Sequence, residues 1–117
     1  WCYPKPAQRP HPPILLGGET DKTLARIVDY CDGWFPRGGP DFDPAVAVSR
    51  LKAACAQAKR DFAGMQITVF RAPADADGLK RYADAGITRV LLDAPDSSRD
   101  EVLRLLDQYA ELVTKTA

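Results

Sequence analysis

Short apolar runs alternate with amphipathic stretches along the whole chain, and this alternation constrains the fold more than any other feature. The runs predicted to form buried strands cover residues 14–16, 33–35, 66–70 and 87–92. The stretches predicted to form helices cover residues 21–30, 44–61 and 77–85, with a final helix behind Ser98. No two strands are adjacent in the sequence, so tight hairpins are not expected. The order βαβαβαβα therefore predicts a parallel α/β sheet with crossover helices.

Capping residues mark the ends of these helices. The residues expected to cap them are Thr20 or Asp21, Asp43 before a proline, Gly86, and Ser98 with Glu101 three residues later. Apolar spacing then predicts which faces are buried. The helix over 44–61 is expected to bury Val48, Leu51, Cys55 and Ala58.

Two architectures fit this alternation: an open doubly wound sheet, or part of a closed (β/α)8 barrel. A complete barrel needs roughly 250 residues. This chain has 117 residues and four strand–helix units, so it would supply half of one. We expect a single partial domain over residues 1–117, in which residues 1–13, with five prolines, form an extended lead-in. Because the chain begins with Trp1, we expect a cut or processed end there.

Charge and cysteine usage exclude several classes of function. The 16 basic and 16 acidic residues cancel, so no electrostatic argument favours nucleic acid. No apolar run approaches about 20 residues, so we expect no membrane-spanning helix. The three cysteines share no CxxC spacing. That pattern favours a cytoplasmic location over a disulfide framework, and we expect no metal site.

Paired glycines end the first two apolar runs, Gly17-Gly18 and, shortly after Phe35, Gly38-Gly39. At the carboxyl end of a parallel strand, glycine lets backbone amides approach a ligand, and the following helix favours a phosphate with its N-terminal dipole. Arg37 lies between the two pairs in sequence and offers a charge partner. The competing interpretation is that the glycines only allow tight turns.

Four segments resemble the C-terminal half of luciferase-like monooxygenases. This (β/α)8 superfamily includes bacterial luciferase and the flavin- or coenzyme F-420-dependent oxidoreductases. The most specific feature is the proline-rich segment ending in Gly17-Gly18, followed by Asp-Gly-Trp-x-Pro at 32–36. The residues of these motifs are most similar to those of the F-420-dependent class, and FMN-dependent members have a closely related pattern. The segments that carry the resemblance cover residues 4–18, 25–36, 82–92 and 101–113.

The resemblance implies a set of site residues. In the family, backbone after these first two strands lines the phosphate pocket of the cofactor, FMN or coenzyme F-420. The matching positions are Gly17, Gly18, Phe35, Pro36, Arg37, Gly38 and Gly39. The pocket for the redox-active ring belongs largely to the N-terminal half in the family. The catalytic residues are therefore unknown here, and we expect no turnover by this chain alone.

Two functions follow. In the first, the chain is the phosphate-binding half of an oxidoreductase or monooxygenase, which passes a hydride between the cofactor and a small organic substrate or activates oxygen. In the second, it is a non-catalytic half-barrel whose exposed sheet edges pair with a second copy or another chain.

Three further residues have two interpretations each. His11 is a surface residue of the lead-in or a base. Trp34 is a core or pocket-wall residue or a stacking platform. Asp93 is a functional side chain at a strand end or part of a polar turn.

Overall fold

Four parallel strands form one sheet in the computed structural model, which describes residues 3–116. The strands lie side by side in sequence order, and every neighbouring pair is parallel. A doubly wound sheet reverses its strand order at a switch point, and this sheet has no reversal. The predicted α/β half of a (β/α)8 barrel is therefore confirmed. The strands are β1 (Leu15–Gly17), β2 (Gly33–Phe35), β3 (Gln66–Phe70) and β4 (Arg89–Leu91).

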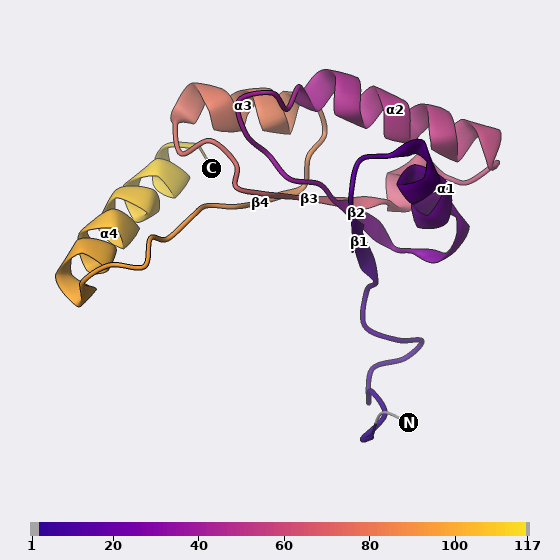
Figure 1. Cartoon of the computed structure of the whole chain (residues 1–117), viewed down its shortest axis with the longest axis horizontal. Helices are drawn as coiled ribbons and strands as arrows, with labels where there is room; N and C mark the ends of the chain where they lie inside the picture. Colours follow the sequence, from indigo (N-terminus) through magenta and orange to yellow (C-terminus); the bar gives the residue numbers. More distant parts are fainter. Residues whose placement is uncertain (1–2, 117) are drawn as a thin grey trace.

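A helix follows each strand. Figure 1 shows α2 and α3 along the same side of the sheet, with α4 beyond α3 at the end farthest from β1. Three of the predicted caps are present: Thr20 caps α1, Asp43 caps α2, and Ser98 exchanges hydrogen bonds with Glu101 at the start of α4. The C-cap of α3 is Ala85 rather than the predicted Gly86, which follows it with a positive φ of 93°. The helices are α1 (Asp21–Tyr30), α2 (Pro44–Gln57), α3 (Ala76–Asp84) and α4 (Arg99–Thr116), with a 3-10 turn η1 (Phe62–Gly64) before β3.

The hydrophobic core lies between the sheet and its helices. Trp34, Ile67 and Val69 from the strands pack with Ile27 and Leu51 from α1 and α2, and each of these side chains is at most 1% exposed. Side chains alternate along a strand, so the strand residues next to Trp34, Ile67 and Val69 face the opposite side of the sheet. On that side the large apolar residues are half-buried or exposed: Phe35, Phe70 and Leu91.

The second helix is shorter than predicted. It ends at Gln57, four residues before the expected end at residue 61, and Ala58 is exposed rather than buried. The cause is local, because Lys59 takes a left-handed backbone with φ 54° and the carboxylate of Asp61 starts η1 by accepting from the Ala63 amide at 2.9 Å. The guanidinium of Arg60 turns back to the carbonyls that end α1, those of Ile27, Val28 and Cys31. The fourth strand is also shorter than the predicted 87–92: it covers Arg89–Leu91, and Ile87 and Thr88 join it to the turn at residues 85–86.

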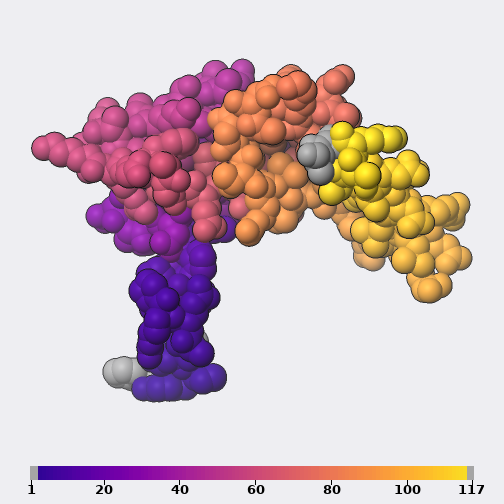
Figure 2. Space-filling model, turned by 180° about the vertical axis from the view of Figure 1, so that it is seen from behind, coloured from indigo at the N-terminus to yellow at the C-terminus, as the bar shows by residue number. Residues whose placement is uncertain are grey.

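Residues 3–13 project away from the body of the molecule as an exposed, non-helical segment (Figures 1 and 2). Residues 1–2 lie outside the described part of the chain, and over residues 3–13 the predicted lead-in forms no helix or strand. That the lead-in is extended stays a prediction. Its junction with β1 is held by Asp32, whose carboxylate accepts from the Ile14 amide at 2.7 Å. Among the helices described, none is both long and apolar enough to cross a membrane.

Candidate functional site

A cavity of about 760 Å³ opens where the four strands end. Each strand contributes to its wall through the segment that follows it, and α2 closes one side with Arg50. In parallel sheets, ligands bind at the carboxyl ends of the strands, because the connecting loops meet there. The residues contributed by the four connections are Glu19 after β1, Arg37 to Asp43 after β2, Arg71 and Ala72 after β3, and Asp93 after β4.

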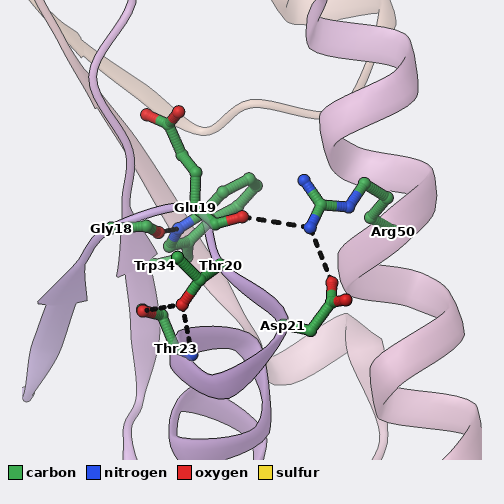
Figure 3. Close-up of polar contacts among 7 residues, drawn as sticks. All are labelled: Gly18, Glu19, Thr20, Asp21, Thr23, Trp34 and Arg50. Atoms are coloured by element: carbon green, nitrogen blue, oxygen red, sulfur yellow. Dashed lines mark hydrogen bonds and ion pairs between the residues drawn. The ribbon is translucent and has the colours of Figure 1, made fainter.

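The β1–α1 connection is tied down by hydrogen bonds within the chain (Figure 3). The buried indole of Trp34 donates to the Gly18 carbonyl at 2.7 Å, and the Thr20 hydroxyl accepts from the Thr23 amide at 3.2 Å. Gly18 has a positive φ of 100°, and a Cβ there would lie 3.0 Å from the Thr23 hydroxyl oxygen. This glycine is therefore required by the turn itself. Gly17 pairs with Phe35 in the sheet register.

Arg50 fastens the same connection to α2. Its guanidinium donates to the Glu19 carbonyl at 3.0 Å and to the Asp21 carboxylate at 2.7 Å (Figure 3). The side chain of Glu19 reaches in another direction, to the next connection, where it accepts from the Arg37 amide at 3.2 Å. Glu19 therefore links the connections after β1 and β2 across the wall of the cavity.

The two glycines of the β2–α2 connection have different surroundings. Gly38 is buried, its amide donates to the Phe70 carbonyl at 2.6 Å, and a Cβ there would lie only 2.6 Å from the Arg71 carbonyl oxygen. Only glycine lets the segments that follow β2 and β3 approach this closely. Gly39 has a φ of 142°, and no atom lies within 4 Å of the place where its Cβ would be. Gly39 lines the cavity, so its backbone borders open space.

Two of the three arginines that line the cavity are already paired with carboxylates. Arg50 pairs with Asp21 at 2.7 Å, and Arg71 pairs with Asp93 at 2.6 Å. The guanidinium of Arg37 makes no ion pair or hydrogen bond with any residue in the described range 3–116. It is therefore the arginine in this wall whose charge is left for a ligand.

The connections after β3 and β4 are held in a fixed relation. Arg71 has a left-handed backbone with φ 60°, which is uncommon for a residue with a side chain. Its guanidinium bonds the Asp93 carboxylate, and the Asp93 carbonyl accepts from the Tyr109 hydroxyl at 2.7 Å. Strained backbone of this kind persists where the surrounding structure holds it, and such positions cluster at ligand sites.

The structure separates the seven site residues that the sequence predicted. Arg37, Gly38 and Gly39 line the cavity. Gly17, Gly18, Phe35 and Pro36 lie behind its wall, in the sheet or in the turn that supports it. The assignment of all seven to a phosphate stays a prediction.

Sequence reasoning missed Glu19, Arg50 and Arg71 as residues of this wall. The position of Glu19 and Arg71 directly after a strand is a signal that could have found them. Arg50 lies on a helix far from the connections in sequence, and no local signal marks it.

The other residues singled out by the sequence have these positions. Trp34 forms part of the cavity wall while its ring is buried, and Asp93 lines the cavity. His11 is exposed on the lead-in, with its Nδ1 3.7 Å from the Asp32 carboxylate. Over residues 3–116, no group of three or more His, Cys, Asp or Glu is arranged to hold a metal ion.

Burial raises the pKa of three groups near the core. The Cys31 and Cys55 thiols have raised pKa values, which Arg60 partly offsets, so both are held in the protonated and weakly nucleophilic form. The pKa of the Tyr82 hydroxyl is also raised by burial, against a smaller opposing effect of Arg81. None of these groups is poised for acid–base work near neutral pH.

The chain is similar in sequence to known proteins over most of its length. The family model described as luciferase-like monooxygenase matches residues 2–112. Curated relatives include the uncharacterized proteins Mb0978c of Mycobacterium bovis and MT0980 and Rv0953c of two strains of Mycobacterium tuberculosis. Each is 37% identical to this chain over 114 residues, which is 94% of this chain and 38% of the relative. The chain thus spans about two fifths of the length of these relatives.

Proposed function

The chain belongs to the luciferase-like monooxygenase family, and on this premise we propose that it is the half of a (β/α)8 oxidoreductase that binds the phosphate of a flavin-type cofactor, FMN or coenzyme F-420. The observation that carries the proposal is the cavity at the strand ends, with Arg37 unpaired in its wall among the described residues. Phosphate sites of barrels are frequently built from neighbouring late βα connections. Guanidinium groups bind phosphates strongly, because they offer paired donors and a permanent charge.

For an anionic group the wall offers one guanidinium that is unpaired among the described residues, that of Arg37, and the carboxylates of Glu19 and Asp41 line the same cavity. The glycine pairs contribute less than the sequence suggested. The amides of Arg37 and Gly38 are already bonded, to Glu19 and to the Phe70 carbonyl. The guanidinium of Arg37 and the open backbone at Gly39 remain, and these two residues would hold the phosphate. The bound cofactor would supply hydride transfer or oxygen activation, while this chain would fix the position of its phosphate.

The remaining four strands of such a barrel must come from a further polypeptide segment. Within the described residues, β1 and β4 each pair with a single neighbour, so both edges of the sheet are open. Phe70 and Leu91, 41% and 40% exposed, lie on the face away from the helices, which is the interior of a closed barrel. Exposed edges of this kind invite pairing with further strands.

The same open edges favour a second candidate function, a non-catalytic half-barrel that associates with itself or with another chain. It shares the fold of the first candidate and differs in the ligand. If the chain is a non-catalytic half-barrel, its cavity binds neither a cofactor nor a small organic substrate.

Titration separates the two candidates. The whole protein that contains this chain is titrated with FMN and with coenzyme F-420, and residues 1–117 alone are assayed for oxidation of organic substrates and for size by sedimentation. Saturable cofactor binding by the whole protein, without turnover by residues 1–117, supports the first candidate. Self-association of residues 1–117 without any cofactor binding supports the second. Turnover by residues 1–117 alone would contradict the assignment of a half-site.

A further inference from the structure

The side chain of Glu19 occupies a position in which a ligand phosphate would compete with it. Its carboxylate accepts from the Arg37 amide at 3.2 Å, in the wall of the cavity that Arg37 also lines. An amide next to an unpaired guanidinium is a natural donor for a phosphate. In this chain that donor is already taken by an internal anion.

The backbone around Glu19 is fixed, whereas its side chain is not. The carbonyl before it, of Gly18, accepts from Trp34 at 2.7 Å, and its own carbonyl accepts from Arg50 at 3.0 Å. In Figure 3 the Glu19 carboxylate points away from both contacts. The carboxylate is exposed, and its bond to Arg37 is the one hydrogen bond it makes among the described residues. Rotation about side-chain bonds therefore releases the amide without moving the connection.

We propose that Glu19 is a built-in anion that competes with the ligand phosphate for the Arg37 amide and sets the charge that the site accepts. The inference rests on the proposed function and deepens it. A carboxylate within a few ångströms of a phosphate repels it, and the repulsion grows with the charge of the phosphate. A phosphate monoester carries close to two negative charges near neutral pH, and a phosphodiester carries one. Glu19 therefore penalises a monoester such as FMN more than a diester such as the phosphate of coenzyme F-420.

The test compares Glu19→Gln with the parent in the whole protein, by titration with FMN, coenzyme F-420 and riboflavin, which has no phosphate. One unit charge at about 4 Å in water is worth about fivefold in affinity, and salt reduces it. We expect the Glu19→Gln variant to bind FMN about tenfold more tightly and coenzyme F-420 about threefold more tightly, and riboflavin unchanged. Equal gains for all three ligands, or no gain for FMN, would overturn the proposal.

A matched control is Asp41→Asn, which removes the same charge from the same cavity wall. The Asp41 carboxylate accepts no hydrogen bond from the Arg37 amide in the described chain, so its charge does not lie where the phosphate would bind, and we expect a smaller gain in FMN affinity than with Glu19→Gln. An equal gain in FMN affinity would mean that binding depends only on the net charge of the cavity wall and not on the contact between Glu19 and the Arg37 amide. If the parent and both variants fail to bind any of the three ligands, the proposed function is wrong, and the inference falls with it.

A measurement without ligand tests the role of Glu19 separately from the proposed cofactor binding. Hydrogen exchange at the Arg37 amide reports directly on its bond to Glu19. Faster exchange in Glu19→Ala than in the parent confirms the internal contact whether or not a cofactor binds. Unchanged exchange would show that the carboxylate does not occupy this amide, and the competition would then be excluded even if FMN binds.

Discussion

One glycine pair, Gly17-Gly18, lies at the end of β1, and the other, Gly38-Gly39, lies in the connection after β2; the structure uses the two pairs differently. The backbone carbonyls of Gly18 and Glu19 in the first connection, after β1, are already bonded within the chain. Trp34 holds the Gly18 carbonyl at 2.7 Å, and Thr20 caps the helix that follows. The second connection is open at Gly39, where a Cβ would meet no atom within 4 Å. Its Arg37 guanidinium has no partner within residues 3–116.

A glycine pair at a strand end therefore does not specify a ligand site by itself. The deciding property is whether the backbone groups and charges of the connection are already bonded within the chain. In the first connection they are bonded, and the glycines serve the turn. A substitution at Gly18 therefore tests folding and binding together, whereas a substitution of the Arg37 side chain tests binding alone.

The two glycines of the second connection are expected to differ most in what they tolerate. Gly38→Ala places a Cβ 2.6 Å from the Arg71 carbonyl oxygen, so the segments that follow β2 and β3 must separate. We expect a loss of about 2–3 kcal/mol in the free energy of unfolding, typical of overpacking against backbone. Gly39→Ala meets only backbone strain, and we expect about 1 kcal/mol. Urea denaturation of the whole protein measures both. Equal losses would show that the neighbouring glycines do not differ.

The second prediction concerns binding. Arg37→Ala removes the unpaired guanidinium of the cavity wall. We expect the binding free energy of FMN or coenzyme F-420 to weaken by about 1.5–3 kcal/mol, as for loss of a hydrogen bond to a charged group. The control is Arg99→Ala, an exposed arginine at the start of α4, which should bind like the parent. Isothermal titration measures both. If Arg37→Ala also binds like the parent, the second connection is only a turn.

The sequence predicted the fold well, because the fold depends on local patterns. The bounds of α1 and of β2 and β3 agree with the prediction, since capping residues and apolar spacing mark them in the sequence. The end of α2 was wrong because it depends on Arg60, which bonds carbonyls of a helix about 30 residues earlier. A contact of that kind leaves no local signal.

The candidate site was predicted less completely for the same reason. Arg37, Gly38 and Gly39 follow directly from the motif and line the cavity. The contribution of Arg50 depends on how α2 packs against the first connection, a relation that spacing does not encode. Whether the Arg37 amide is free or bonded also depends on the rotamer of Glu19 in the preceding connection. Sequence patterns thus find the connections that meet, and the structure is needed to tell which of their groups are already bonded.

The third prediction tests how firmly the first connection is closed. Trp34→Phe keeps most of the buried ring and removes the donor to the Gly18 carbonyl. We expect a loss of about 1 kcal/mol in the free energy of unfolding. Tyr109→Phe is the matched control in the fourth connection, where a hydroxyl donates to the Asp93 carbonyl from a half-buried position. There we expect about 0.5 kcal/mol, because water can replace the lost donor. A larger loss in Tyr109→Phe would contradict the closed state of the first connection.

Each of the two connections ends in a helix N-cap, and the two caps are expected to differ slightly in how much they stabilise the fold. Asp43 accepts from the Ala45 and Val46 amides at 2.9 and 3.1 Å, whereas Thr20 accepts from one amide at 3.2 Å. We therefore expect Asp43→Ala to cost about 1 kcal/mol of unfolding free energy and Thr20→Ala about 0.5 kcal/mol. Asp43→Asn keeps the acceptor and should cost less than Asp43→Ala, which separates the hydrogen bonds from the charge at the helix N-terminus. Urea denaturation of the four proteins decides the order. If Thr20→Ala costs more than Asp43→Ala, the single bond of the Thr20 cap stabilises the first connection more than the two bonds of the Asp43 cap stabilise the second, which contradicts the expected order.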